Sequence, residues 1–418
     1  MRTPFLLLVL LAPPALAQTA GLDAVTEAAV ELAPGDLDAV LDAVGDARVV
    51  LLGEAWHGDG GAIALRAEIV EALHEQLGFN VLAFESDFFG VQRGWARVRE
   101  GEPVSAVRDD VYGFWTETVA AAPLWVYVAE QAARGDTLHI AGVDSQILSE
   151  RSRLELPGWL REHLSTLDGA DPAEVGAAVD AVAAALGTPG AMPEAAHAEA
   201  FAVLRRLLFR LEHEAKDPFV AQTAESLRRN VQGENRDIAM GLNTVWVATE
   251  GYPGEKVIVW AHNNHVLMSK WAFWDGPMGA EARAQPGFSP AELAGTGYLG
   301  DHVRWAFGRD AVSIATVPYE GTYSPDIAPV LRRQPADFDS TAVLAPAPTG
   351  TVEAALANAG HDRAFVDLRP LRSRRDVLPS RVFGYHSGSA PARVLLAEGW
   401  DGLLFLRRTH GLNESAPD

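Results

Sequence analysis

The stretch VVLLGEAWHGDGG (49–61) decides the fold that we expect for this chain of 418 residues. Its first four residues are apolar and predict a buried strand, which breaks into a glycine-rich turn that carries Glu54 and His57. A helix is predicted over about 61–77, and a second apolar strand, NVLAF (80–84), follows it. Two such strands joined by a helix form a βαβ unit, whose strands are parallel.

Similar apolar runs recur along the chain and alternate with longer segments of helical periodicity. The six runs are RVVLL (48–52), NVLAF (80–84), TLHIAGV (137–143), KVIVWA (256–261), AVSIATV (311–317) and GLLFLR (402–407). Continuous apolar strands separated by helices are typical of a sheet that is covered on both faces. We therefore predict an α/β fold, with a mainly parallel sheet flanked by helices. Between about 150 and 250 helical periodicity alone predicts an inserted helical subdomain, and 322–360, rich in Pro and Ala, predicts a surface excursion.

The amino terminus has the pattern of a secretory signal. Residues 1–17 contain one arginine, an apolar run and the small residues that precede a cleavage site near Ala17. We expect the mature chain to comprise residues 18–418 and to be exported, to the periplasm or the medium. No later run reaches the ~20 apolar residues of a membrane helix, so no membrane anchor is expected.

Composition excludes several classes of function. The chain has no cysteine, which rules out disulfides, thiolate catalysis and Cys-based zinc sites. Its 34 basic and 56 acidic residues give a net charge of −22, which argues against binding to nucleic acid. A small-molecule substrate is the partner that remains, and composition leaves the oligomeric state open.

Ionisable side chains follow five of the predicted strands. In chain order these are Glu54 and His57, Glu85, Asp144, His262 and His265, and Tyr319 and Glu320. Ligands of open parallel sheets bind at the carboxyl ends of the strands, so we expect these residues to meet at one edge. Three of the 12 histidines have this placement, which suits a general base near neutral pH. Arg66, on the first helix, is predicted to reach back toward them.

Other catalytic patterns fail. A G-x-S-x-G elbow and H-E-x-x-H are both absent, and GTGYLG (295–300) lacks the preceding strand of a dinucleotide site. The remaining histidines that we weighed are expected to be surface or core residues: His74, His139, His213, His302 and His386. A serine hydrolase is therefore disfavoured.

Seven segments, taken together, resemble the erythromycin esterase family. They are GEAWHG, LRAEIVEAL, GFNVLAFESD, AGVDSQ, ENRDIAM, VWAHNNHV and GYLGDHVRWAFGRDAVSIATVPYEGTYS, in order across about 50–325, with a weaker echo at 398–406. The resemblance implies an α/β core with a helical subdomain and a hydrolase that opens macrolide lactone esters, an antibiotic-resistance activity. It also implies that His57 is the base, supported by Glu54, Arg66, Glu85, His262 and His265.

The turn departs from the family pattern at Trp56, which is bulky where a small polar residue is expected. We therefore predict that Trp56 lines the substrate site. Four further residues are expected to contact substrate there: Asp144, Arg236, Tyr319 and Glu320.

For ester or lactone hydrolysis, we expect His57 to take a proton from water while Glu54 or Glu85 orients it. Arg66 would pair with one of these carboxylates. His262 or His265 would face the oxyanion or protonate the leaving alkoxide.

Two alternatives from other classes stay open. One is a metal-dependent hydrolase or peptidase that uses the same Glu and His residues as ligands of a divalent ion. The other is a non-catalytic protein that binds haem or iron. The favoured interpretation needs no cofactor.

Overall fold

The computed structural model describes residues 14–136, 138–187, 198–269, 272, 297–331, 337–385 and 390–415. Residues 1–13 of the predicted signal and His386 therefore lie outside the described residues. The last part of the signal belongs to helix α1 (Pro14–Glu27), and its cleavage stays a prediction. Within the described ranges, no helix combines the length and apolar character that a membrane span needs.

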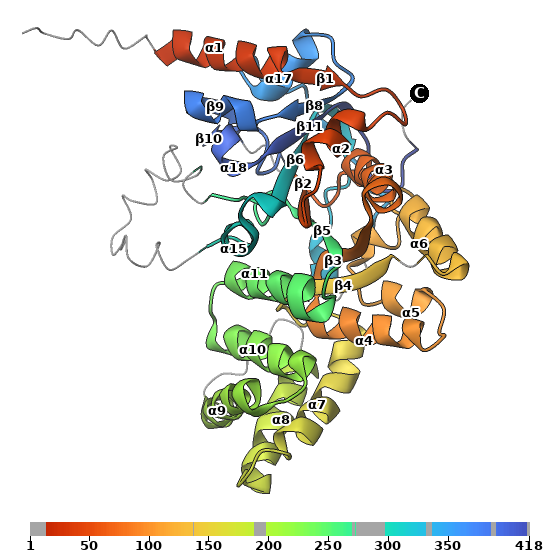
Figure 1. Ribbon diagram of the computed structural model, residues 1–418, viewed down its shortest axis with the longest axis vertical. Coiled ribbons are helices and arrows are strands. Elements are labelled where there is room, and N and C mark those ends of the chain that lie inside the picture. Colours follow the sequence, from red (N-terminus) through yellow and green to blue (C-terminus); the bar gives the residue numbers. More distant parts are fainter. Residues whose placement is uncertain are drawn as a thin grey trace, which may run out of the picture.

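A mixed sheet forms the centre of the molecule (Figure 1). Its six parallel strands are, in spatial order, β11 (Gly402–Thr409), β6 (Ala311–Tyr323), β2 (Val49–Glu54), β5 (Lys256–His262), β3 (Phe79–Asp87) and β4 (His139–Asp144). These are the six predicted strands, and the predicted α/β fold is confirmed. Strands β8 (Arg363–Asp367) and β1 (Ala29–Glu31) extend the β11 edge in antiparallel pairing.

Helices cover both faces of the sheet, as a strand such as β2, buried along its whole length, requires. Helix α3 (Gly60–Leu77) packs with α6 (Ala122–Arg134) on one side, and α11 (Arg236–Trp246) packs with α15 (Leu299–Phe307) on the other (Figure 1). Further helices are α2 (Asp38–Val44), α4 (Phe88–Arg99), α5 (Ser105–Arg108), α16 (Ala328–Leu331) and α18 (Leu396–Gly399).

The first βαβ unit has the limits that its sequence predicts. Asp59 caps the start of α3 by accepting a hydrogen bond from the Ala62 N–H. Gly78 ends the helix in the left-handed conformation, with φ 69°. These two caps fix where the turn that carries His57 leaves the strand and where the helix begins.

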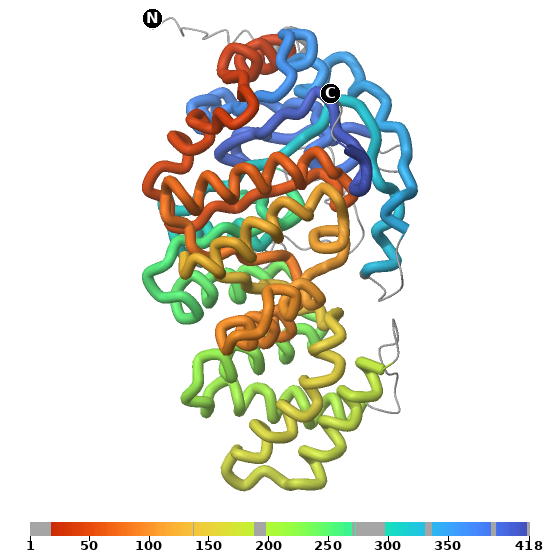
Figure 2. Tube along the Cα trace, turned by 90° about the vertical axis from the view of Figure 1, so that its right-hand side faces the viewer, coloured from red at the N-terminus to blue at the C-terminus, as the bar shows by residue number. Residues whose placement is uncertain are grey.

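Four helices lie beyond the sheet, at the lower end of Figures 1 and 2. They are α7 (Glu150–Leu164), α8 (Pro172–Gly187), α9 (Ala198–Glu214) and α10 (Pro218–Gln232). Their buried side chains form an apolar cluster of their own, distinct from the core around the sheet, and Phe219 packs against both. Helix α11 then leads back from this helical region to β5.

The segment 322–360 is more ordered than its composition suggests. Strand β6 extends through Tyr323 and pairs there with β7 (Ala342–Leu344). Helix α17 (Val352–Asn358) is largely buried, so the prediction of a surface excursion was wrong for it. Its alanines are small enough to pack closely, which a search for large apolar residues overlooks. A separate antiparallel pair, β9 (Val377–Ser380) and β10 (Ala392–Leu395), follows.

Candidate active site

The turn after β2 is tightly packed against neighbouring strands. A Cβ atom at Gly53 would collide with the Asn263 side chain, which lies just beyond β5. One at Gly58 would collide with the Ser324 carbonyl beyond β6. Only glycine fits at both positions, so the two glycines of GEAWHG hold Glu54 and His57 close to the ends of β5 and β6.

His57, Glu54 and Arg66 form a buried chain of contacts. His57 Nδ1 lies 2.7 Å from Glu54 Oε1, and Glu54 Oε2 forms an ion pair with Arg66. Arg66 also donates to the Leu52 carbonyl at 3.2 Å, and its guanidinium lies 4.0 Å from the Trp260 ring centroid. Glu54 is the carboxylate that both His57 and Arg66 contact.

Aromatic rings enclose the His57 imidazole. The short helix η1 (Gly113–Trp115) supplies Phe114, which stacks on His57 with a centroid distance of 4.9 Å and an interplanar angle of 2°. Trp115 meets the same imidazole edge-on at 5.2 Å, and its indole Nε1 donates to Glu54 Oε1 at 3.0 Å. His262 lies 5.4 Å away on another side.

This environment keeps His57 neutral. Burial lowers its pKa to about 4, the positive charges of His265 and Arg236 act in the same direction, and Glu85 opposes them. Because an ionised Glu54 accepts only, Nδ1 carries the single ring proton and Nε2 keeps its lone pair. The His57 side chain is 13% exposed, so water can reach it.

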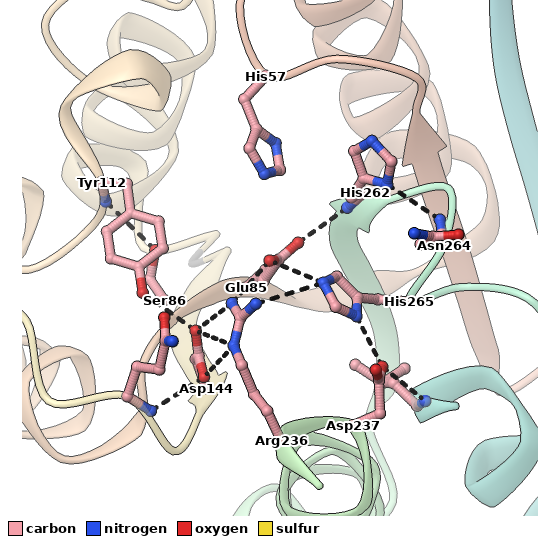
Figure 3. Close-up of polar contacts among 12 residues, drawn as sticks. His57, Glu85, Ser86, Tyr112, Asp144, Arg236, Asp237, His262, Asn264 and His265 are labelled. Atoms are coloured by element: carbon pink, nitrogen blue, oxygen red, sulfur yellow. Dashed lines mark hydrogen bonds and ion pairs between the residues drawn. The ribbon is translucent and has the colours of Figure 1, made fainter. Parts of the chain in front are cut away.

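Glu85 lies in an irregular stretch of β3, where the register with β4 shifts between Phe84 and Asp87. Its Oε1 accepts from Arg236 at 2.7 Å and lies 3.1 Å from His265 Nε2, while Oε2 accepts from the His262 backbone N–H at 2.9 Å. Although burial alone would raise the pKa of Glu85, the charges of His265 and Arg236 hold it well below its usual range. Figure 3 shows Glu85 at the centre of the cluster.

Arg236 connects Glu85 to Asp144 at the end of β4. Its Nε lies 2.9 Å from Asp144 Oδ1, and its NH2 group contacts Oδ2 of the same carboxylate. Tyr112 donates its hydroxyl to Asp144 at 3.0 Å. The Arg236 side chain is 29% exposed, and its NH1 lies 3.4 Å from Nε2 of His265. When His265 is an imidazolium, both of these nitrogens are donors, so NH1 can turn to an acceptor on a ligand.

His265 is held in its charged form. Its Nδ1 lies 2.6 Å from Asp237 and its Nε2 lies 3.1 Å from Glu85. Burial by itself would lower the pKa of His265, but these two carboxylates raise it to about 10. At neutral pH this imidazolium donates to both carboxylates (Figure 3).

His262, only three residues away, is kept neutral by burial, and backbone groups contact both of its ring nitrogens. Its Nε2 lies 2.9 Å from the Ala55 carbonyl, and its Nδ1 accepts from the Asn264 N–H at 3.1 Å. Burial lowers its pKa to about 3, assisted by His57, which becomes positive only once it is protonated at low pH, and by the positive charge of His265. Both ring nitrogens are occupied, so a proton transfer through His262 would first have to break one of these bonds.

Three of the residues predicted to contact substrate lie in other surroundings. Trp56 donates its indole N–H to the Ser324 carbonyl at 2.9 Å and packs against a small aromatic cluster beside β7. Tyr319 and Glu320 were expected after the end of β6 but lie within it, because pairing with β11 and β7 lengthens this strand. Glu320 faces Arg408 of β11 at 3.9 Å.

The other predicted residues gather as expected at the carboxyl ends of the strands. These are Glu54, His57, Arg66, Glu85, Asp144, Arg236, His262 and His265. In the part of the chain that the structure describes, no group of three or more His, Asp or Glu side chains has the geometry to hold a metal ion. The carboxylates that a metal would need are already paired, Glu54 with Arg66, and Glu85 and Asp144 with Arg236.

Four residues of the cluster were missed by sequence reasoning: Tyr112, Phe114, Trp115 and Asp237. None follows a strand. The signal that would have found three of them is VYGFW (111–115), an aromatic run around a glycine in the connection that leaves the carboxyl end of β3. Asp237 is adjacent to Arg236 at the start of α11.

Comparison with known proteins agrees with this architecture. The chain is 22% identical over 412 residues to YbfO of Bacillus subtilis (strain 168), a protein named as a hydrolase, and the match covers 86% of this chain and 83% of YbfO. A solved succinoglycan biosynthesis protein has the same fold, with a TM-score of 0.69, 17% identity and coverage of 95% and 98% of the two chains.

An erythromycin esterase mutant, EreC in its open conformation, also shares the fold. The TM-score is 0.62 and the identity 16%, with coverage of 93% of this chain and 97% of EreC. The family model described as erythromycin esterase matches residues 74–409, which is most of the chain. The chain therefore belongs to the erythromycin esterase family.

Proposed function

We propose that this protein is a hydrolase that cleaves a carboxylic ester or lactone with a water molecule activated by His57. The observation that carries the proposal is the state of His57, which is neutral and bonded to Glu54 through Nδ1, with no hydrogen bond recorded at Nε2 from the residues that the structure describes. A neutral imidazole with one oriented nitrogen is the form that a general base requires.

In the proposed reaction, Nε2 of His57 takes a proton from water as the water oxygen attacks the carbonyl carbon. Glu54 stabilises the imidazolium that forms, and Arg66 keeps Glu54 ionised and in place. When the tetrahedral intermediate collapses, the carbon–oxygen bond to the leaving alkoxide breaks. His57 returns its proton to this alkoxide, so the products are an alcohol and a carboxylic acid, and the base is regenerated.

The charged half of the cluster suits the oxyanion. Arg236 offers its NH1 group as a donor, and the imidazolium of His265, 3.4 Å from that nitrogen, adds a second positive charge. Asp144, Glu85 and Asp237 hold these two cations in position before substrate binds. Donors that are fixed in advance cost no reorganisation during the reaction.

Family membership and the hydrolase name of YbfO support the class of reaction. A macrolide-like lactone is the substrate that we propose first, because the family and EreC carry the name of an erythromycin esterase. Simple esters and smaller lactones form the comparison set.

The test is a screen of the purified protein against macrolides, simple lactones and aryl esters. His57→Ala should lower the hydrolysis rate by ~10²–10⁴-fold, since it removes the general base. The matched control is His74→Ala, which removes a buried histidine that contacts Tyr127, far along α3. Hydrolysis by His57→Ala at the wild-type rate would contradict the proposed base.

Two further measurements on the same protein test the alternative functions, a metal-dependent hydrolase and a haem-binding protein. The proposed mechanism needs no metal, so rates should be equal with and without chelator. A loss on chelation that zinc or manganese restores would instead support a metal-dependent hydrolase. A Soret band after haem addition that disappears in His57→Ala would support a haem-binding protein.

We further propose that the protein is exported and that the mature chain begins at Gln18. The basis is the sequence pattern of residues 1–17. Expression with the native amino terminus, followed by fractionation and amino-terminal sequencing of the product, tests it. A cytoplasmic product that retains Met1 would contradict it.

A further inference from the structure

Trp115 is a buried residue to which the mechanism above gives no role. Its side chain has no exposed surface, and its backbone carbonyl is fixed by the indole of Trp125 at 2.7 Å. Its own indole N–H points at Oε1 of Glu54, the oxygen that also contacts His57. Two donors therefore converge on one carboxylate oxygen.

The donors around Glu54 leave no lone pair of Oε1 free. A carboxylate oxygen has two lone-pair sites, which Trp115 and His57 fill, while Arg66 neutralises Oε2. Each donor is attracted to the same negative charge, so each one weakens the attraction between Glu54 and the other donors. The indole thus competes with the imidazolium that His57 becomes during the reaction.

We propose that Trp115 is a positioning residue. It shares Oε1 of Glu54 with His57, and it therefore limits how strongly Glu54 stabilises the imidazolium form of His57, which carries a second ring proton. This inference rests on the proposed function. Phe114, stacked on the other side of the imidazole, keeps the ring in the plane from which Nδ1 meets Oε1. Trp115 and Phe114 together favour a state of His57 that, after it has taken a proton from water, releases this proton to the leaving group.

The other charged and titratable groups that face this site act on His57 from separate elements. They are Arg66 of α3, Glu85 of β3, His262 and His265 at the end of β5, and Arg236 of α11. Trp115→Phe leaves all of them in place and keeps an aromatic ring. It removes the N–H donor to Glu54 together with the second ring of the indole.

Histidine titration by NMR tests the inference without any substrate. In protein labelled at histidine Cε1, the signal of His57, identified by its loss in His57→Ala, should titrate near pH 4 in the wild type. In Trp115→Phe the midpoint should rise by about one pH unit, the usual scale of environmental shifts in folded proteins. Circular dichroism at each pH defines the range over which the fold is intact.

The matched control is Trp95→Phe, which also removes a buried indole N–H, here bonded to His139 at the opposite end of the sheet. It should leave the His57 midpoint at the wild-type value. With a hydrolysable ester, Trp115→Phe should shift the acid limb of kcat against pH by the same amount as the midpoint, with KM unchanged.

The following outcomes decide whether Trp115 has the proposed role. An unchanged His57 midpoint in folded Trp115→Phe would overturn the role of Trp115, whatever the activity. If the wild type hydrolyses no ester, the proposed function fails while the titration still judges Trp115. Should Trp115→Phe not fold, the wild-type indole resonance of Trp115 serves instead: it should move at the His57 midpoint, and a constant position would overturn the inference.

Discussion

Two halves of the candidate active site use the same residue type in opposite charge states. In the half built on the β2 turn, His57 and His262 are buried, and this burial lowers their pKa values to about 4 and about 3. In the half between β3 and α11, two carboxylates raise the pKa of His265 to about 10. Burial alone therefore makes a histidine neutral, and carboxylate partners reverse its effect.

The difference divides the chemistry between the halves. A neutral imidazole can accept a proton from water, whereas a permanent imidazolium and Arg236 can hold a developing negative charge. The two halves meet at Glu85, which accepts from the His262 backbone N–H on one side and from His265 and Arg236 on the other.

Within the charged half, the largest expected effect comes from removing its available donor, Arg236. Arg236→Gln should lower kcat for ester hydrolysis by ~10²–10³-fold, as loss of one oxyanion donor does. Steady-state kinetics measures it. Arg151→Gln is the control, since Arg151 also pairs with a buried carboxylate, Asp110, but outside the cluster. Equal losses in both variants would remove Arg236 from the chemistry.

The next largest effect on kcat is expected from substitutions of the two neighbouring histidines, His262 and His265. His265→Gln removes a positive charge near the reacting atoms and should lower kcat by about 10–100-fold, given an effective dielectric constant of about 20. His262→Gln should change kcat by only a few-fold, because both nitrogens of His262 serve backbone groups. A larger loss for His262→Gln would reverse the assignment of the two halves.

The pH dependence of the free energy of unfolding should reveal that His262 is neutral and His265 is charged. An unfolded histidine titrates at about 6.5, but folded His262 resists protonation until about pH 3, so its contribution destabilises the fold increasingly below pH 6.5. Folded His265 keeps its proton up to about pH 10, so the stability that it adds is complete below pH 6.5 and is lost as the pH rises through 10.

Urea unfolding at a series of pH values separates these contributions. Relative to wild type, His262→Gln should flatten the acid side of the stability profile, and His265→Gln the alkaline side. Parallel profiles for all three proteins would show that neither histidine has the shifted pKa.

The smallest effect is expected at Trp56, whose indole ties the β2 turn to Ser324 rather than to the charged cluster. Trp56→Phe removes one hydrogen bond and should cost about 0.5–1.5 kcal/mol of unfolding free energy, with kcat almost unchanged. Denaturant unfolding and kinetics measure the two quantities. A change in substrate preference among the esters would support the prediction that Trp56 lines the substrate site.

Much of the sheet could be predicted from the sequence because strands buried on both faces have unbroken apolar runs. All six parallel strands carry this signal. Strands β1, β7, β9 and β10 do not, since they are short and only partly buried, and their pairing depends on distant residues. The end of β6 was misjudged for the same reason: its last residues are strand only because β11 and β7 lie beside them.

The site was predictable where a side chain lies at the carboxyl end of a strand, as for Glu54, Glu85, Asp144 and His262. It was not predictable where the side chain comes from a connection, as for Trp115 and Asp237, whose partners lie 61 and 28 residues away. The charge states were also hidden. His262 and His265 are three residues apart in one turn, and only the contacts in three dimensions separate their pKa values.

The separate apolar cluster of helices α7 to α10 has an evolutionary consequence. Because its side chains pack mainly with one another, substitutions there change the stability of that region without disturbing the layers around the sheet. This packing leaves the two parts free to accept substitutions separately, and solved proteins at 16–17% identity keep one fold over more than nine-tenths of this chain. That freedom ends at Arg236, where the chain returns from the helices and must again satisfy Glu85 and Asp144.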